Sequence, residues 1–322
     1  MSETRLDGWV PFRIYWPGPE PAVECCYMGS NGFPDPFFTS TMHLEVQTPF
    51  NTLFRRHVTM SELARWSELS PGVAPAGFIF HSSRCGSTLI TRLLAALPQN
   101  LVLSEPEPLS ALLVPNPAVP RAPDAARIAW LRCMMSALGQ LRSGVEQRLF
   151  VKFEPTGISE LALLRQAFPG VPWIFVYREP VEVLVSQLRR PAPFVTLGML
   201  RIPAPGIENS QSEEEYAARA LGAVFELAAT NLPDTHALLV HYRELPGAVW
   251  GRIASHFGLA FSDDEIGRLR AAATVDAKNP KQRFEPDTES KNREATESIR
   301  GLAEHWMGEA YHLLEAARDR YS

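Results

Sequence analysis

The sequence has few cysteines and no long apolar run. Its 322 residues include four cysteines, Cys25, Cys26, Cys85 and Cys133, without a C-x-x-C spacing. This pattern argues against a disulfide framework and gives no zinc signature, so we expect no metal site and a reducing, cytoplasmic location. No stretch approaches the roughly 20 apolar residues of a membrane span, and the polar first residues contain no signal-peptide core.

The chain also lacks an excess of positive charge. Lys and Arg number 31 against 36 Asp and Glu, which leaves a formal charge of -5. A protein that coats nucleic acid needs a basic surface, so we expect no nucleic-acid partner and look for anion binding in local clusters only. The sequence indicates no oligomeric state.

The pattern of the chain changes near residue 72. Aromatic residues and turn formers fill residues 1–70, which predicts short antiparallel strands and a helix over 59–69. Short apolar runs then alternate with helical stretches, which is typical of a parallel sheet. We therefore predict a β-rich extension over residues 1–72 and an α/β domain over 73–322.

Five short apolar runs predict a roughly five-stranded parallel sheet, at residues 78–81, 101–104, 149–153, 173–177 and 237–241. Periodicity and capping residues predict helices over 88–97, 124–141 and 181–188, from Ser212 to Leu227, from Ser262 onward, and over about 290–320. Two proline-rich stretches, 106–123 and 189–211, fit no regular element. Because ligands bind at the carboxyl ends of parallel strands, both stretches are expected at the rim of an active site.

The first anion motif follows the first of these strands. Six residues with small or polar side chains connect the strand to an amphipathic helix: Ser83, Arg84, Cys85, Gly86, Ser87 and Thr88. Such a turn points backbone N–H groups and a helix N-terminus at an anion, and Arg84 adds a full positive charge.

The motif is not a Walker A loop. His81 stands where the first glycine belongs, and Ser87 stands where the lysine belongs. An ATP or GTP hydrolase is therefore disfavoured. A strand-turn-helix junction with ordinary serine caps remains the alternative interpretation.

The second anion motif follows the strand at 173–177. Arg178 stands at the end of that strand, and Ser186 lies about two turns into the next helix. A guanidinium and a hydroxyl can converge on one phosphate. The alternative is that Arg178 only neutralises Glu182 across one helical turn.

Together the two motifs resemble the sulfotransferases that use 3′-phosphoadenosine 5′-phosphosulfate (PAPS). The loop over 84–88 resembles the family's 5′-phosphosulfate loop, with Arg84 in place of its lysine, and Arg178 with Ser186 resembles its 3′-phosphate motif at the same spacing of eight. The resemblance covers about residues 77–320. It implies a P-loop NTPase-like three-layer α/β/α fold, PAPS as co-substrate and no metal.

The resemblance also implies catalytic residues. Lys152 matches a family lysine at the end of a strand, and Glu154 stands where many members carry a catalytic histidine. Glu105 resembles the catalytic glutamate of carbohydrate and tyrosyl-protein sulfotransferases. Glu105 and Glu154 are thus alternative bases, with Glu105 preferred, and Glu154 has the further alternative of pairing with Lys152.

A basic stretch before the last predicted helix resembles the loop with which family members complete the 3′-phosphate site. Lys281 and Arg283 are its candidate binding residues, although the family's Arg-Lys-Gly pattern is absent. A solvated loop is the alternative.

The implied function is transfer of a sulfuryl group from PAPS to a hydroxyl or amine of a small molecule, glycan or lipid. Arg84 and Lys152 would stabilise the charge that develops on the departing phosphate. Two alternatives remain: a degenerate member that binds the nucleotide without transfer, and a nucleotide kinase with an aberrant loop.

Overall fold

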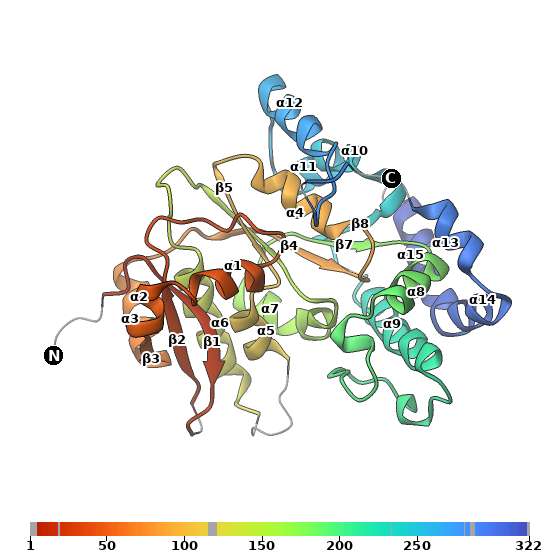
Figure 1. The fold of residues 1–322 in the computed structure, drawn as a ribbon, viewed down its shortest axis with the longest axis horizontal. Helices are drawn as coiled ribbons and strands as arrows, with labels where there is room; N and C mark the ends of the chain where they lie inside the picture. Colours follow the sequence, from red (N-terminus) through yellow and green to blue (C-terminus); the bar gives the residue numbers. More distant parts are fainter. Residues whose placement is uncertain are drawn as a thin grey trace. The chain divides into compact units, whose positions relative to one another are not determined.

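The computed structural model describes residues 5–18, 20–114, 121–232, 234–279, 281–283 and 287–320, and it contains two sheets (Figure 1). The smaller sheet is antiparallel in the order β1-β2-β3. Its strands are β1 (Trp9–Tyr15), β2 (Ala22–Tyr27) and β3 (Arg56–Thr59). The larger sheet has the order β5-β6-β4-β7-β8. Its strands are β4 (Pro75–His81), β5 (Asn100–Ser104), β6 (Arg148–Lys152), β7 (Trp173–Tyr177) and β8 (Ala237–His241).

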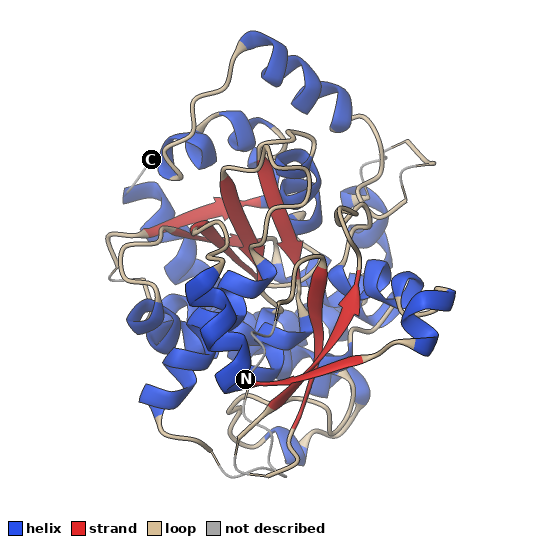
Figure 2. Ribbon diagram, turned by 90° about the vertical axis from the view of Figure 1, so that its left-hand side faces the viewer, coloured by secondary structure: helices blue, strands red, loops and turns tan. Residues whose placement is uncertain are grey.

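These sheets confirm the predicted α/β fold class. All five predicted parallel strands are present, and the N-terminal segment forms the predicted antiparallel strands, drawn in red in Figure 2. The strands of the larger sheet are short and almost entirely buried, because a parallel sheet is covered on both faces.

Helices make up most of the remaining regular structure. In chain order they are α1 (Phe38–Glu45), α2 (Pro49–Leu53), α3 (Met60–Leu69), α4 (Ser87–Ala95), α5 (Glu107–Leu113), α6 (Asp124–Leu138), α7 (Leu161–Ala167), α8 (Pro180–Arg189), α9 (Glu213–Thr230), α10 (Gly247–Trp250), α11 (Arg252–His256), α12 (Asp263–Ala272), α13 (Thr288–Glu294), α14 (Glu297–Ala303) and α15 (Glu309–Arg320). No helix within the described ranges is both long enough and apolar enough to cross a membrane.

Three helical predictions need correction. The N-terminal segment also contains α1 and α2, which the turn-rich composition concealed. The stretch 106–123 was predicted to be irregular, but it begins with α5, because Pro108 stands in the first turn, where a proline costs no helical hydrogen bond. Residues 115–120 of that stretch lie outside the described residues. The single helix expected over 290–320 is interrupted at Thr296, whose side chain accepts a hydrogen bond from Ile299 N and starts α14.

The chain forms two compact units. Unit 1 comprises Met1–Phe78, Thr91–Phe153 and Glu160–Val171, and unit 2 comprises Ile79–Ile90, Glu154–Ser159 and Pro172–Ser322. This division follows contacts in space, whereas the predicted boundary at residue 72 follows a change of sequence pattern.

Each unit has its own buried helices. In unit 1, α3 packs against α6 and buries Leu63 and Trp66. In unit 2, α9 contacts both α8 and α15 and buries one long face, which includes Leu221 and Phe225. The parallel pair of β7 and β8 is in register from Trp173 opposite Ala237 to Tyr177 opposite His241, so both strands end at the same edge.

Candidate functional site

The loop of unit 2 that was predicted to bind an anion contains residues with left-handed backbone. It joins the end of β4 to the start of α4, and Ser83, Arg84 and Gly86 have φ angles of 69°, 51° and 84°. Such angles are unfavourable for residues other than glycine and occur mainly where function demands them. The amide of Ser83 donates to His81 Nδ1 at 3.0 Å, which gives His81 a structural role at the base of the loop.

Gly86 cannot be replaced without a clash. A Cβ atom at this position would lie 2.6 Å from Leu245 Cδ1 and 3.0 Å from Tyr242 Cδ2. Glycine is therefore required both by its φ angle and by the close approach of the chain after β8.

Two hydrogen bonds fix the loop to neighbouring elements. Gln187 on α8 donates to the hydroxyl of Ser83 at 2.8 Å, and the thiol of Cys85 donates to the carbonyl of Val176 at 3.1 Å. Cys85 is completely buried. These contacts favour a packing role for the Cys85 side chain.

A cavity of about 230 Å³ brings the two predicted motifs together. Loop residues 84–88 line it together with Arg178 and Ser186. Ser83, in contrast, is buried and is not among the residues that line the cavity. Two motifs that are about 90 residues apart in the sequence thus line one space within unit 2.

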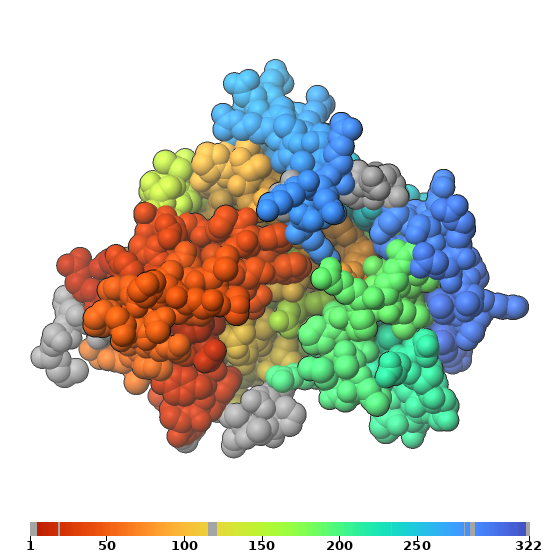
Figure 3. Space-filling view, in the orientation of Figure 1, coloured from red at the N-terminus to blue at the C-terminus, as the bar shows by residue number. Residues whose placement is uncertain are grey.

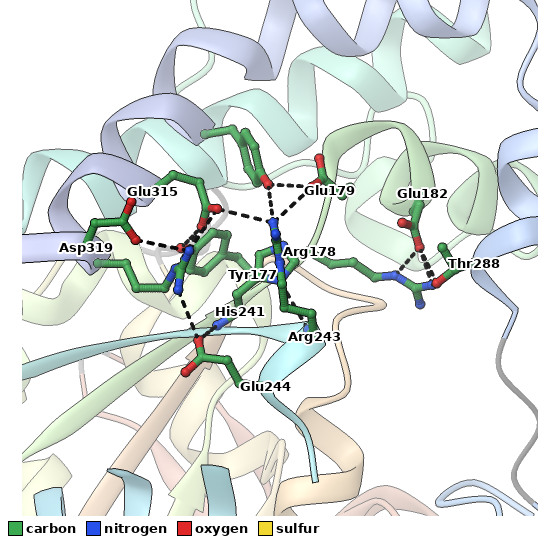
Figure 4. A network of polar contacts seen from close by, with 12 residues as sticks. Tyr177, Arg178, Glu179, Glu182, His241, Arg243, Glu244, Thr288, Glu315 and Asp319 are labelled. Atoms are coloured by element: carbon green, nitrogen blue, oxygen red, sulfur yellow. Dashed lines mark hydrogen bonds and ion pairs between the residues drawn. The ribbon is translucent and has the colours of Figure 1, made fainter. Parts of the chain in front are cut away.

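Arg178 is buried at the end of β7, as predicted. Its Nε donates to Glu182 Oε2 at 2.6 Å, and its Nη2 donates to Thr288 Oγ1 at 3.0 Å (Figure 4). Nη2 also donates to Asp287 Oδ1 at 2.8 Å. The pairing with Glu182 across one helical turn is therefore present, but it occupies only part of a guanidinium that also lines the cavity.

Six further lining residues are distant in the chain from both motifs: Tyr242, Asp276, Ala277, Lys278, Asp287 and Lys291. Lys278 begins the basic stretch over residues 278–283, and sequence analysis placed none of the other five in the site. Lys291 Nζ pairs with Asp287 Oδ2 at 2.8 Å, and the Lys291 side chain is 3% exposed. The spacing of four between these residues was a visible signal for an ion pair, but nothing in the sequence linked that pair to Arg178.

Charge interactions in this cavity shift several pKa values. Burial lowers the pKa of Lys291, and the nearby charge of Arg178 acts in the same direction. For Asp287, burial alone would raise the pKa, but the hydrogen bonds from Lys291 and Arg178 outweigh it and lower the pKa. The two cations therefore hold Asp287 in its ionised form.

Lys281 and Arg283 are exposed, and Arg283 forms an isolated antiparallel bridge with Val275. Among the described residues, the lysines that line the cavity are Lys278 and Lys291. The basic stretch over residues 278–283 thus contributes Lys278 to the cavity lining, whereas Lys281 and Arg283 lie on the surface, and Lys291 of α13 also lines the cavity.

The predicted catalytic pair Glu105 and Lys152 lies in unit 1. β5 and β6 are parallel with Ser104 opposite Lys152, which places both residues at the same strand ends. Lys152 Nζ lies 2.9 Å from Glu105 Oε1 and 4.7 Å from the centre of the Phe37 ring. Glu105 itself has a left-handed φ of 56°. Glu154, the alternative base, is half-buried and belongs to unit 2.

A second polar network surrounds the end of β8 (Figure 4). His241 is buried, and its Nδ1 accepts hydrogen bonds from Arg243 N at 3.1 Å and Arg243 Nε at 2.9 Å. Arg243 in turn pairs with Glu315 of α15 at 3.3 Å. These contacts explain His241 as a structural histidine that ties the C-terminal helix to the sheet.

Comparison with known proteins gives similarities in structure only. No protein-family model matches the chain, and no curated protein sequence matches it. The chain is similar to the sulfotransferase domain of the Synechococcus PCC 7002 olefin synthase, with 18% identity, a TM-score of 0.42, and coverage of 76% of this chain and 95% of that one. For the sulfotransferase STF9 from Mycobacterium avium the identity is 14%, the TM-score 0.47 and the coverage 74% and 79%. For the mouse sulfotransferase SULT7A1 complexed with PAP the identity is 13%, the TM-score 0.37, and the coverage 77% of this chain and 96% of that one.

Proposed function

We propose that this protein is a sulfotransferase that takes a sulfuryl group from PAPS and passes it to a hydroxyl or amine. The observation that carries the proposal is the cavity of unit 2, which is lined by loop residues 84–88 and by Arg178 and Ser186. PAPS carries a 5′-phosphosulfate and a 3′-phosphate, so it needs two separate anion sites of this kind. The loop would take the first group and Arg178 with Ser186 the second.

In the proposed reaction, the bond between the sulfuryl sulfur and the bridging oxygen of the 5′-phosphate breaks. The sulfur forms a new bond to the acceptor oxygen or nitrogen, and adenosine 3′,5′-bisphosphate (PAP) leaves. Negative charge develops on the bridging oxygen, and positioned donors there are the main catalytic contribution. We assign this role to Arg84, Lys152 and the backbone amides of residues 85–88.

The acceptor must also lose a proton, and we assign it to a carboxylate. Glu105 is the preferred base and Glu154 the alternative. Glu105 carries its ion pair with Lys152, which fixes the position of one carboxylate oxygen. Comparison of Glu105→Gln with Glu154→Gln would identify the base, because only loss of the true base removes transfer without removing PAP binding.

The acceptor is expected to be a small molecule, glycan or lipid. We assign acceptor choice in part to the connection between α8 and α9, green in Figure 3. Its apolar side chains Leu197 and Met199 are 65% and 50% exposed. We also propose a reducing, cytoplasmic location, because the four cysteines, Cys25, Cys26, Cys85 and Cys133, are free thiols.

A nucleotide-binding protein without transfer activity is the second candidate. Arg84 replaces the lysine of the resembled motif, and its Nη2 donates to the carbonyl of Arg190. A guanidinium held by this carbonyl could still bind a phosphate. It would be less able to move with the bridging oxygen as the 5′-phosphate leaves. Transfer of labelled sulfate from PAPS to any acceptor would exclude this candidate.

Calorimetric titration with PAP and, separately, with ATP and magnesium tests the proposal. Micromolar PAP binding, about -8 kcal/mol, without ATP binding is the expected result. Binding of ATP and magnesium alone would instead favour the kinase interpretation. If neither nucleotide binds, the sulfotransferase proposal is wrong.

A further inference from the structure

The carboxylate of Asp287 bridges two buried cations in the cavity of unit 2. Its Oδ1 lies 2.8 Å from Arg178 Nη2, and its Oδ2 lies 2.8 Å from Lys291 Nζ. The side chains of Arg178 and Lys291 are each 3% exposed, whereas that of Asp287 is 44% exposed. One partly exposed carboxylate thus pairs with two buried cations, of which Arg178 also pairs with Glu182.

This use of Asp287 is unusual for its position. Asp287 is the N-cap residue of α13, where an aspartate side chain normally accepts a hydrogen bond from the first turn of the helix. Its side chain makes no capping hydrogen bond here. The carboxylate is instead directed to Arg178 and Lys291, so the helix does not account for its orientation.

Arg178 pairs with two carboxylates, of which Glu182 is fixed and Asp287 is exchangeable. Glu182, which is 5% exposed, accepts a hydrogen bond from Arg178 Nε at 2.6 Å, pairs with Arg178 Nη2 as well, and accepts a hydrogen bond from Thr288 Oγ1 at 3.1 Å. Displacement of Asp287 would leave Arg178 still paired with Glu182. The Nη2 hydrogen bond that Arg178 now donates to Asp287, and the Lys291 ammonium, would then be available to an incoming anion with two or more oxygens.

We infer that Asp287 is an internal counter-anion that occupies the donors of Arg178 and Lys291 and is displaced by the 3′-phosphate of the nucleotide. The inference rests on the proposed function and adds Lys291 and Asp287 to it as determinants of specificity. A phosphate monoester presents several oxygens and up to two negative charges, so it satisfies both cations better than one carboxylate does. A nucleotide without a 3′-phosphate has nothing to exchange for Asp287.

Titration of PAP and of adenosine 5′-phosphate into the full chain and three variants tests the inference. Asp287→Asn removes the competing charge, and we expect it to tighten PAP binding about tenfold, or about 1.4 kcal/mol, with adenosine 5′-phosphate unchanged. Lys291→Met removes a phosphate donor while keeping an apolar side chain of similar length, and should weaken PAP binding to a similar extent. Glu294→Gln is the matched control, because Glu294 accepts from Arg189 Nε at 2.6 Å and so joins α13 to α8 without lining the cavity.

Thermal unfolding provides a second readout. Without nucleotide, Asp287→Asn leaves the buried Arg178 and Lys291 side chains with less compensating negative charge, so its midpoint of thermal unfolding should fall below that of the wild type. Saturating PAP should raise this midpoint by more in Asp287→Asn than in the wild type. If Asp287→Asn weakens PAP binding, Asp287 positions the cations instead of competing for them, and the inference is wrong. Unchanged PAP affinity in Asp287→Asn would also overturn it. A wild type that binds PAP no more tightly than adenosine 5′-phosphate would instead overturn the proposed function itself.

Discussion

The guanidinium carbon of Arg178 lies 3.9 Å from the centre of the Tyr242 ring. The ring covers one face of the guanidinium, so its N–H groups can point only along their own plane, toward Glu182, Asp287 and the cavity. Tyr242 also limits the space beside Gly86, so one aromatic side chain contacts both predicted anion motifs.

Removal of this ring should weaken PAP binding. We expect Tyr242→Leu to lower the affinity about fivefold, because a desolvated cation–π contact contributes about 1 kcal/mol. Tyr242→Phe keeps the ring and should bind as the wild type does in the same calorimetric titration. Equal losses in both variants would assign the effect to the hydroxyl group.

Arg178 should contribute more than any other side chain to recognition of the 3′-phosphate. Arg178→Ala removes charge-assisted hydrogen bonds worth about 1.5–3 kcal/mol, so PAP affinity should fall at least tenfold while adenosine 5′-phosphate binds as before. Arg189→Ala is the control, because Arg189 also joins α8 to α13 but lies outside the cavity lining. A loss of affinity in Arg189→Ala equal to that in Arg178→Ala would mean that helix docking, and not the phosphate contact, is being measured.

Gly86 should tolerate no side chain. Gly86→Ala adds a strained φ angle, about 1 kcal/mol, and overpacking against Leu245 and Tyr242, about 1–3 kcal/mol. Gly258→Ala has the same kind of strain, with φ of 64°, but no neighbour within 4 Å of the added carbon. Urea unfolding should therefore show a larger loss of stability in Gly86→Ala, and equal losses would refute the steric argument.

Removal of one partner of the ion pair between Lys152 and Glu105 should lower the free energy of unfolding. Lys152 is 1% exposed, so Glu105→Gln leaves a buried ammonium without its carboxylate and should cost about 3–5 kcal/mol of unfolding free energy. The double variant Glu105→Gln with Lys152→Met removes the charge as well and should recover most of this loss. If the double variant is as unstable as Glu105→Gln alone, the pair is not what stabilises this strand end.

Acid should destabilise unit 2 through His241. Burial, aided by the charge of Arg243, lowers the pKa of His241 to about 4, whereas an unfolded histidine titrates near 6.5. Between these values the unfolded chain binds more protons, so stability is complete above about pH 6.5 and falls by on the order of 3 kcal/mol as the pH drops toward 4. His241→Gln should remove this part of the pH dependence, and the same substitution at exposed His312 should leave it in place.

The sequence predicted the sheet and both anion motifs because each is encoded locally. An apolar run of five residues predicts a buried strand, and a strand followed by small residues and a helix predicts a phosphate-binding turn. Arg178 and Ser186 share one strand-helix connection, so their spacing could be recognised without knowledge of the fold.

The parts that sequence analysis missed depend on contacts between distant segments. Lys291 enters the cavity because α13 packs against α8, more than 100 residues earlier in the chain. Lys281 and Arg283 carried the expected charge without the family's Arg-Lys-Gly pattern, and both are exposed. Helix α5 was missed for a different reason, because prolines that usually end a helix stand in its first turn.

The positions of the segments along the chain determine when the residues that line this cavity are synthesised. Unit 2 receives its loop from Ile79–Ile90 and the rest of its cavity from residues after Pro172, with unit 1 segments between them. A nascent chain that has emerged only to α8 carries both anion motifs, but not yet Lys291. Nucleotide binding as proposed here would therefore have its full set of contacts only after α13 has been synthesised.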